Sequence, residues 1–461
     1  MNTKHIDFEK MNKIHFIGIG GISMSALARL VMAKGIRVSG SDRQVSDITR
    51  QLEKSGACII YEQTGRNITE DIDMVVYTAA ISSDNDELRT AYEKNIPVMV
   101  RADFLGLLMK EYSTAVCVAG THGKTTTTSM LAHILMEGEK DPTVLVGGIL
   151  DSIGGNLRIG NSENFVTEAC EYTNSFLSFF PTVAIVLNVS EDHLDFFKDI
   201  DDIRHSFRKF LELVPDDGLV ILNEDIPEPE YFLEGLKCRV ITIGRNIRKN
   251  NISAAAIVMN ERACCSYDLI INGEKKGHIS LSVTGEHNVY NSLAAIAAAL
   301  DMGVSVKAVE EGLKSYGGTE RRFEYKGEFN GVTVIDDYAH HPDEIKATLD
   351  TAKNYPHKDI WVVFQPHTYS RTKAFLKEFG ETLSKADHVV LAEIYAAREK
   401  DTLGISSGDV AACVAEYGTD VYYIHTFEEI EKFLKNSCTQ GDLLITMGAG
   451  DVVNIGNDLL K

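Results

Sequence analysis

The sequence lacks the marks of several protein classes. Its eight cysteines are scattered without a Cys-x-x-Cys pair, and the adjacent Cys264 and Cys265 suit neither a usual disulfide nor a zinc knuckle. No run of about 18 apolar residues occurs, and no signal peptide opens the chain. Lys and Arg number only 46 against 67 Asp and Glu, which gives a net charge of −21. We therefore expect a cytoplasmic protein with reduced thiols that binds neither a membrane nor nucleic acid.

The length and the spacing of glycine turns indicate several domains. With 461 residues, of which 44% are hydrophobic, the chain is long enough for about three domains with real cores. A strand followed by a glycine turn occurs in each presumed domain, which favours an α/β fold. The polar stretch Lys110–Thr114 and the glycine-containing stretch Tyr316–Phe323 separate these parts. The predicted domains are therefore 1–110, 111–318 and 319–461.

The stretch Val116–Thr128 predicts a phosphate-binding loop. An apolar run, Ala115–Ala119, reads as a buried strand, and the segment Thr127–Met136 has the apolar period of a helix. Between them, glycines allow backbone N–H groups to approach phosphate oxygens at the positive end of the helix. Lys124 can reach terminal phosphates, and the Thr125 hydroxyl can bind Mg²⁺. The first glycine of the longer Walker pattern is missing, because Val118 stands in its place.

The N-terminal glycine loop is nearly a dinucleotide fingerprint. The strand Lys13–Ile17 is followed by Gly18-Ile-Gly-Gly-Ile-Ser-Met24 and an apolar helix to Ala33. Ser23 replaces the third glycine, and Asp42 follows the next strand, Arg37–Gly40, at about the spacing of a ribose-binding carboxylate. From the residues alone, NAD is the expected ligand of this loop.

Two strand ends in the presumed central domain bear groups that can hold Mg²⁺ or phosphates. The strand Phe165–Glu168 ends in a carboxylate, and the strand Ala184–Asn188 is followed by Asp192 and His193. Further along, Asn288 and Asn291 open a predicted helix and are three residues apart, so their side chains share one face.

These strings together resemble the Mur ligase family, whose members join amino acids to cell-wall precursors. The similar parts are Gly120-Thr-His-Gly-Lys-Thr-Thr126, the Asn-x-x-x-Asp-His-x-Asp string at 188–195, the string at 285–291, and Asp337–Pro342. In this family the shortened phosphate loop is usual, and the first glycine loop holds the diphosphate of a UDP-sugar rather than NAD. The resemblance implies a Rossmann-like N-terminal domain, a P-loop-type central ATPase sheet and a Rossmann-like C-terminal domain. It also implies ATP and Mg²⁺ as cofactors, and UDP-N-acetylmuramate and L-alanine as substrates joined through an acyl phosphate.

The resemblance assigns residues to four groups. The residues expected at ATP are Gly120, Thr121, His122, Gly123, Lys124, Thr125, Thr126, Asn288, Asn291, Arg322 and Asp337. Those expected at the UDP-sugar are Gly18, Gly20, Gly21, Ser23, Met24, Asp42 and Thr78. Thr125, Glu168 and His193 are the expected metal ligands. Tyr338, His340 and Arg371 are expected at the substrate end, with Lys124, His193, His340 and Arg371 as the catalytic residues.

Several alternatives stay open at this point. Glu171 competes with Glu168 as the metal carboxylate, and Arg321 competes with Arg322 at ATP. Many Mur ligases have a carbamylated lysine in the region of Lys209, but this residue reads as a solvated helix position. The adjacent His340 and His341 do not predict zinc, because no Cys or further His lies at ligand spacing.

Three other functions compete with the main hypothesis. An NAD-dependent oxidoreductase would use the first glycine loop but leaves the Lys124 loop unexplained. A nucleotide-binding switch without catalysis leaves His340 and Arg371 without purpose. A ligase that recycles whole cell-wall peptides shares the same scaffold.

Overall fold

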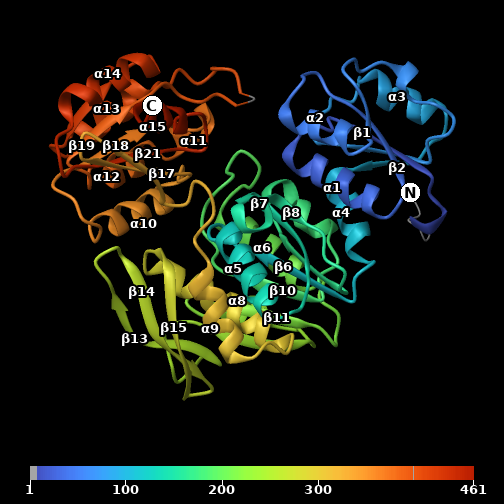
Figure 1. Cartoon of the computed structure of the whole chain (residues 1–461), viewed down its shortest axis with the longest axis horizontal. Helices are drawn as coiled ribbons and strands as arrows, with labels where there is room; N and C mark the ends of the chain where they lie inside the picture. Colours follow the sequence, from blue (N-terminus) through green and yellow to red (C-terminus); the bar gives the residue numbers. More distant parts are fainter. Residues whose placement is uncertain (1–7, 398) are drawn as a thin grey trace.

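The computed structural model describes residues 8–397 and 399–461, and these residues form three α/β domains, each built on its own sheet (Figure 1). The structure thus confirms the predicted fold class. The N-terminal sheet has five parallel strands in the order β3-β2-β1-β4-β5. Its strands are β1 (Lys13–Ile17), β2 (Arg37–Ser41), β3 (Cys58–Ile60), β4 (Met74–Tyr77) and β5 (Val98–Val100). Its helices are α1 (Ile22–Ala33), α2 (Asp47–Lys54), α3 (Asp86–Glu93) and α4 (Arg101–Met109).

The central sheet has ten strands in the order β15-β14-β13-β12-β11-β10-β6-β9-β7-β8. The strands are β6 (Thr114–Ala119), β7 (Thr143–Leu150), β8 (Gly155–Arg158), β9 (Asn164–Glu168), β10 (Val183–Val186), β11 (Leu219–Asn223), β12 (Arg239–Ile243), β13 (Ile252–Met259), β14 (Cys264–Ile271) and β15 (Glu274–Thr284). The helices are α5 (Lys124–Glu137), α6 (Ile200–Leu211), α7 (Pro229–Leu233), α8 (His287–Asp301) and α9 (Val306–Ser315), with a 3₁₀ segment η4 (Tyr172–Ser178). Strands β10, β6 and β9 lie in parallel at the centre of this sheet, so their carboxyl ends meet at one edge.

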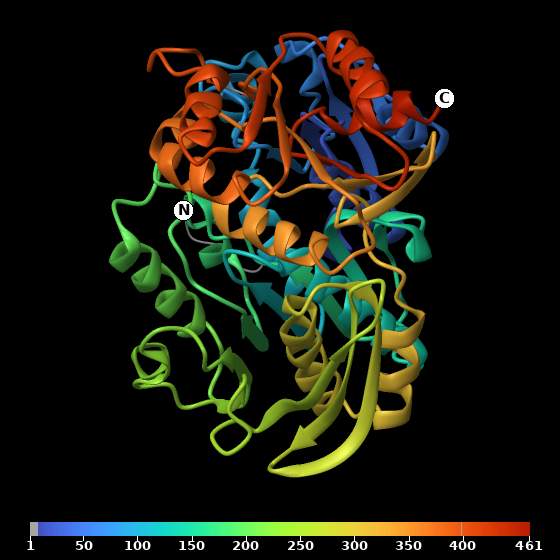
Figure 2. The same ribbon diagram turned by 90° about the vertical axis from the view of Figure 1, so that its left-hand side faces the viewer.

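The C-terminal sheet has six strands in the order β16-β17-β21-β18-β19-β20, and only β16 is antiparallel to its neighbour. Its strands are β16 (Glu324–Phe329), β17 (Val332–Asp337), β18 (Ile360–Phe364), β19 (His388–Leu391), β20 (Asp420–Tyr423) and β21 (Leu443–Met447). Its helices are α10 (Pro342–Ala352), α11 (Tyr369–Ala374), α12 (Leu376–Leu383), α13 (Ser407–Ala415), α14 (Phe427–Ser437) and α15 (Val453–Leu459). In Figure 2 this domain lies above the central domain, and α10 runs along the side that faces it.

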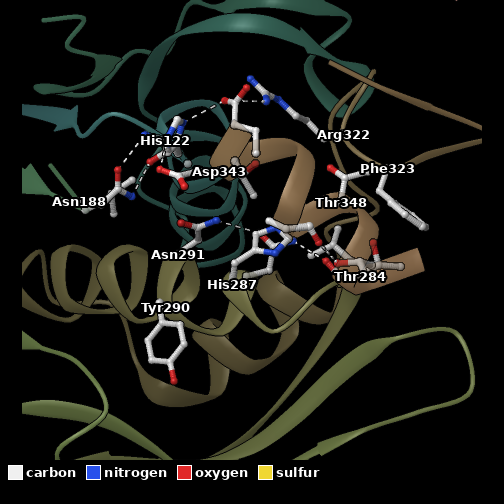
Figure 3. Close-up of a pocket in the computed structure, with 18 of the residues that line it drawn as sticks. His122, Asn188, Thr284, His287, Tyr290, Asn291, Arg322, Phe323, Asp343 and Thr348 are labelled. Atoms are coloured by element: carbon white, nitrogen blue, oxygen red, sulfur yellow. Dashed lines mark hydrogen bonds and ion pairs between the residues drawn. The ribbon is translucent and has the colours of Figure 1, made fainter. Parts of the chain in front are cut away.

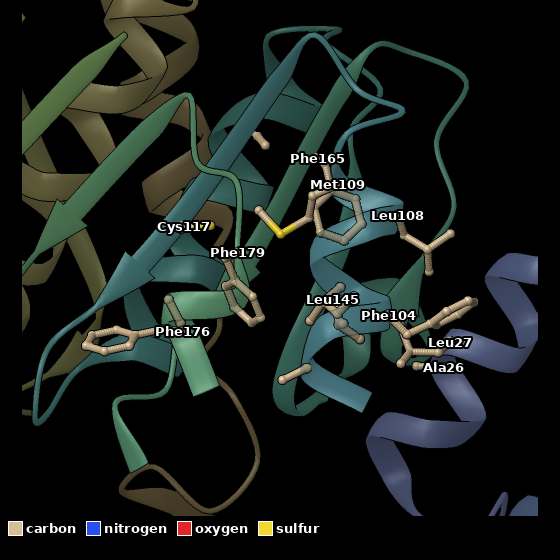
Figure 4. Packing of buried hydrophobic residues seen from close by; sticks show 14 of the residues in the cluster. Ala26, Leu27, Phe104, Leu108, Met109, Cys117, Leu145, Phe165, Phe176 and Phe179 are labelled. Carbon is tan, nitrogen blue, oxygen red and sulfur yellow. The ribbon is translucent and has the colours of Figure 1, made fainter. Parts of the chain in front are cut away.

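The N-terminal and central domains share one hydrophobic core. Figure 4 shows Phe104 and Met109 of α4 between α1 and the central residues Phe165 and Phe179, and one buried cluster includes them all. The approach is close, because a Cβ atom added to Gly106 of α4 would lie 2.0 Å from the carbonyl oxygen of Ser178. The C-terminal domain has separate clusters on the two faces of its sheet.

Local predictions differ from the structure mainly at the ends of elements. The apolar stretch Pro97–Ala102 indicates a single strand from the sequence alone, but in the structure β5 ends at Val100 and α4 begins at Arg101. No Gly or Pro separates the two elements, so the sequence has no local signal for this change. The apolar stretch Met74–Ile81 likewise indicates a single strand from the sequence alone, but β4 ends at Tyr77. No helix among residues 8–397 and 399–461 is both long and apolar enough to span a bilayer.

Candidate active site

The predicted phosphate loop connects β6 to α5. Gly123 has a φ of +86°, in the left-handed region, and immediately precedes α5. A Cβ atom at Gly123 would lie 2.5 Å from Oδ1 of Asn291, so only glycine fits against the α8 side chain. The loop and α8 are therefore packed directly against each other.

Lys124 is held over this loop by its own backbone and by a buried carboxylate. Its Nζ donates to the carbonyl oxygens of Gly120 at 2.5 Å and Thr121 at 3.1 Å, and lies 3.0 Å from Oε2 of Glu171. Burial alone would lower the pKa of Lys124, but the charge and hydrogen bond of Glu171, together with the nearby Cys170 and Glu168, raise the pKa above its ordinary value. Lys124 is thus a fixed cation at the end of β6.

The two candidate metal carboxylates have different partners. Oε2 of Glu168 accepts a hydrogen bond of 3.0 Å from the Thr125 hydroxyl, and Oε1 accepts one of 2.5 Å from the N–H of Gly147. Glu171 is buried and faces Lys124 instead. The structure therefore brings together two of the three predicted metal ligands, Thr125 and Glu168.

The third predicted metal ligand, His193, lies beside Glu171 and Asp192 rather than in contact with Glu168. Its Nε2 is 3.9 Å from Oε1 of Glu171 and 3.7 Å from Oδ2 of Asp192. Its ring stacks on that of Tyr172, with centroids 4.5 Å apart. Burial lowers the pKa of His193, which keeps its imidazole neutral and able to act as a ligand.

A cleft of about 370 Å³ opens between the central and C-terminal domains (Figure 3). This volume lies in the range of small-molecule sites. The predicted ATP residues that line it are His122, Gly123, Thr126, Asn288, Asn291, Arg322 and Asp337, whereas Gly120, Thr121, Lys124 and Thr125 do not. Nδ2 of Asn291 donates to Oδ1 of Asn288 at 2.9 Å, as their shared helix face predicts. The residues assigned to ATP therefore meet across two domains.

The two adjacent arginines of the linker have separate partners. Arg321 donates to Asp336 and to the carbonyl oxygens of Gly448 and Gly450, so its guanidinium is used within the C-terminal domain. Arg322 lines the cleft, with its guanidinium over the ring of Tyr338 at 5.2 Å. Of the two, Arg322 is placed to meet a ligand in the cleft.

Asp337 lies at the end of β17, on the wall of the cleft. Its carboxylate accepts hydrogen bonds from the N–H groups of Phe323, at 2.7 Å, and Ala339, at 2.8 Å. Burial raises the pKa of Asp337 to about 6, although the nearby Arg322 opposes the shift.

The residues predicted at the substrate end form a cluster next to the central domain. Arg371, on α11, donates to Oδ1 of Asp192 at 2.8 Å and lies 3.3 Å from Nδ1 of His367. The His340 ring packs edge-on against His367 and Tyr338. Burial lowers the pKa of His340 to about 4, so its ring is neutral at pH 7.

A second interdomain contact links the phosphate loop to α10. Nδ1 of His122 is 3.2 Å from Oε1 of Glu344, and its Nε2 is 3.9 Å from Oδ2 of Asp343. Burial alone would lower the pKa of His122, but the two carboxylates raise it to about 9. The sequence predicted neither this contact nor the pair of Arg371 with Asp192, because the partners are far apart in the chain.

The residues predicted at the UDP-sugar surround the first glycine loop. Gly18, Gly20 and Gly21 connect β1 to α1, and the N–H of Gly20 donates to Oδ2 of Asp42 at 2.8 Å. Thr78 follows β4 and lies next to Gly18. The Met24 side chain is buried in the core, which leaves only its backbone for a ligand.

Sequence reasoning also missed Arg101 at this loop. The first residue of α4, Arg101 donates to the Ser23 hydroxyl at 3.0 Å and has no carboxylate partner within 4.0 Å among the described residues. The sequence places Arg101 in the apolar stretch Pro97–Ala102, which has no feature that predicts a contact with Ser23. Lys209, in contrast, is exposed on α6, as predicted for a solvated residue.

Comparisons with known proteins agree over the whole chain. Models of the Mur ligase family catalytic domain, middle domain and glutamate ligase domain match residues 13–113, 118–299 and 321–450. A UDP-N-acetylmuramate–L-alanine ligase of Lachnospira eligens is 58% identical over 456 residues, which are 99% of each chain. The crystal structure of UDP-N-acetylmuramate-alanine ligase from Thermotoga maritima is 32% identical, with a TM-score of 0.80 over 97% of this chain and 98% of that one. A murein peptide ligase from Psychrobacter arcticus is 26% identical, with a TM-score of 0.72 over 97% and 98%.

Proposed function

The chain belongs to the Mur ligase family, and from this premise we propose that it joins L-alanine to the lactyl carboxylate of UDP-N-acetylmuramate in an ATP-dependent reaction. The match that supports these substrates is the 58% identity to the ligase of Lachnospira eligens over nearly the full length of both chains. The observation that supports the chemistry is the cleft between two domains, with the phosphate loop on one wall and the end of β17 on the other.

The reaction consists of two displacements. First, an oxygen of the lactyl carboxylate attacks the γ-phosphorus of ATP, the bond to the β–γ bridging oxygen breaks, and ADP leaves. Then the neutral amine nitrogen of L-alanine attacks the carbonyl carbon of the acyl phosphate, phosphate leaves, and the nitrogen gives up a proton. In this proposal Lys124 offsets negative charge on the phosphoryl group as it moves.

Mg²⁺ is part of the proposal, and the side chains around Lys124 fit it. The hydroxyl of Thr125 and the carboxylate of Glu168 are 3.0 Å apart, and oxygen ligands of this kind are those that Mg²⁺ prefers. When bound there, the ion would neutralise charge on the phosphates. Glu171 would stay the partner of Lys124, and His193, whose Nε2 lies 3.9 Å from Oε1 of Glu171, would be the third ligand of the ion.

The proposed base for the amine is His340. Its Nδ1 lies 3.0 Å from the carbonyl oxygen of Tyr338, which only accepts hydrogen bonds, so the Nδ1 nitrogen bears the proton. The Nε2 atom of a neutral His340 is then free to accept a proton. Arg371 would hold a carboxylate or the acyl phosphate, and the closed domain interface would keep water from that intermediate.

The other parts of the proposal follow the family pattern. The UDP-sugar would bind at the loop Gly18–Met24, with Asp42 and Thr78 beside it. The limits 110 and 318 would separate the three domains. The reaction would take place in the cytoplasm, in agreement with eight free cysteines, and no nucleic acid would be needed.

One experiment separates this proposal from its alternatives. Phosphate release from ATP is measured with UDP-N-acetylmuramate and each amino acid in turn, and with a cell-wall peptide that begins with L-alanine. We expect release with L-alanine well above that with other amino acids. Release only with the peptide would instead establish the recycling ligase, and a thermal shift with NAD but not with UDP-N-acetylmuramate would favour the oxidoreductase.

A further inference from the structure

Three potential metal ligands meet where the phosphate loop touches the C-terminal domain. His122, from the loop before α5, lies next to His341 and Asp343, at the beginning of α10. One ligand atom from each residue lies within 4.8 Å of the other two, and no other group of three His, Cys, Asp or Glu in the described chain meets this condition. Figure 3 shows the His122 and Asp343 side chains near each other, one from the phosphate loop and one from α10.

The imidazoles of this group have unused nitrogen atoms. The buried Nε2 atoms of His122 and His341 have no hydrogen-bond partner among the described residues. His341 is 3% exposed, so water has little access to its ring. A buried polar atom without a partner is costly, and a ligand at Nε2 of His122 would remove this cost.

Distances in the group are close to those of a metal site. Oδ2 of Asp343 is 3.9 Å from Nε2 of His122 and 3.9 Å from Nδ1 of His341. The Nδ1 atom of His341 now accepts a hydrogen bond of 3.3 Å from the N–H of Asp343, and an ion bound at Nδ1 would replace that hydrogen bond. Donor atoms around a tetrahedral zinc ion, with bonds of about 2.0 Å, lie about 3.3 Å apart. The Asp343 carboxylate would therefore have to approach each ring by about 0.6 Å.

We propose that His122, His341 and Asp343 form a binding site for a divalent transition-metal ion of the zinc class, which fastens the phosphate loop to the C-terminal domain. Two imidazoles and one carboxylate favour zinc, cobalt or nickel over magnesium, which prefers oxygen ligands. The site is therefore distinct in chemistry from the proposed Mg²⁺ ligands Thr125 and Glu168.

Glu344 supports the proposed ion from a second position. Its Oε1 is 3.2 Å from Nδ1 of His122, on the side of the ring opposite Nε2. A carboxylate that accepts the other N–H of a histidine ligand fixes the tautomer and orients the ring toward the metal. When the ion binds Nε2 of His122, the proton now on that nitrogen passes to solvent, while Nδ1 keeps its proton and its bond to Glu344.

The three ligands come from two domains, and this determines what the ion would do. His122 moves with the central domain, whereas His341 and Asp343 move with α10. An ion bound to all three would hold the cleft closed. The proposal concerns binding and domain closure, and it stands or falls independently of the ligase reaction.

The test uses Co²⁺ as a spectroscopic probe with the full-length protein, without ATP and without Mg²⁺. We expect one Co²⁺ per chain to give visible absorption of a low-coordinate nitrogen and oxygen site, and added Zn²⁺ to displace it. At a Zn²⁺ concentration about 100 times Kd, Tm should rise by about 3 °C or more, because the ion binds only the folded, closed chain.

Two variants and one matched control make the test decisive. Asp343→Asn and His341→Gln should each weaken Co²⁺ binding at least about tenfold and remove the rise in Tm. Asp343 is exposed, so its variant should fold even if loss of the His341 ring destabilises α10. His205→Gln removes an exposed histidine of α6 and should leave both signals unchanged. Equal Co²⁺ binding by wild type, Asp343→Asn and His205→Gln, or no visible spectrum in the wild type, would overturn the proposal.

Discussion

The guanidinium of Arg371 and the carboxylate of Asp192 form an ion pair across two domains, with Nη2 2.8 Å from Oδ1. Both side chains are about nine-tenths buried, at 10% and 9% exposure. Burial alone would raise the pKa of Asp192, but Arg371 and His193 hold it well below its ordinary value. In this structure Arg371 thus has a fixed carboxylate partner, and a substrate carboxylate would have to share or replace it.

The first prediction concerns Arg371. Arg371→Ala should lower kcat/KM for L-alanine by at least about a hundredfold, at about 1.4 kcal/mol per tenfold, with the KM for ATP nearly unchanged. Lys would keep the charge but lose the planar fork of donors, so Arg371→Lys should also be impaired. Steady-state kinetics with varied L-alanine measure both effects.

A double-mutant cycle with Asp192→Asn separates substrate binding from domain pairing. If Arg371 serves only to pair with Asp192, the two single variants and the double variant lose the same activity. We expect Arg371→Ala to cost clearly more than Asp192→Asn. Equal losses of activity would show that Arg371 acts only as the structural partner of Asp192.

The second prediction concerns Lys124. Lys124→Ala should lower phosphate release by at least about a hundredfold, because a preorganised charge is lost from the moving phosphoryl group. UDP-N-acetylmuramate should still raise Tm, since its proposed site lies in the N-terminal domain. Lys209→Ala, which removes an exposed lysine of α6, serves as the control and should keep wild-type turnover. Near wild-type turnover by Lys124→Ala would refute the assignment of the loop.

The third prediction distinguishes the two carboxylates at the proposed Mg²⁺ site. Glu168→Gln should raise the Mg²⁺ concentration for half-maximal activity about tenfold or more, because this side chain is in contact with Thr125. Glu171→Gln should lower kcat through Lys124 while the Mg²⁺ requirement changes little. Titration of activity with Mg²⁺ measures both effects. The reverse pattern would assign the Mg²⁺ ligand to Glu171 instead of Glu168.

The fourth prediction concerns pH and Asp337. Its pKa rises from an ordinary 3.8 to about 6 in the folded chain, so the folded state binds this proton more tightly than the unfolded state. The protonated side chain therefore adds stability that is present below pH 3.8 and is lost as the pH rises through 6. If the ionised form accepts the ribose hydroxyls, ATP affinity should fall as the pH drops below 6, by about tenfold at pH 5.

Binding of ATP to wild type and Asp337→Asn between pH 5 and 7.5 checks this prediction. The variant has no proton to gain, so its affinity should be lower at neutral pH and nearly independent of pH. An equally steep pH dependence in Asp337→Asn would assign the titration to another group.

Local chemistry made much of the molecule predictable from the sequence. The strand, glycine turn and helix around Lys124 follow from a β-branched apolar run, from glycine at the left-handed position 123 and from a regular apolar period. The Asn288 and Asn291 side chains meet because residues three apart share a helix face. The contrast between Glu168 and Glu171 required coordinates, since the turn after β9 determines which carboxylate faces Thr125.

Contacts between domains were not predictable in the same way. Arg371 meets Asp192, and His122 meets α10, only because two separately folded sheets come together at their carboxyl ends. Spacing in the sequence has no signal for such pairs. No Cys or further His lies at ligand spacing from His341 in the sequence, yet the fold places His122 next to it.

The shared core of the first two domains also bears on how the chain is made. A nascent chain that has emerged only to Met109 has α4 but not Phe165, Phe176 or Phe179, against which α4 packs. Phe104 also packs on Phe8 and Phe16 of its own domain, but the side of α4 that faces the central residues is covered only when the central domain follows, so folding of the first two domains is coupled. The C-terminal domain has apolar clusters of its own, so its folding does not depend on completion of that shared core.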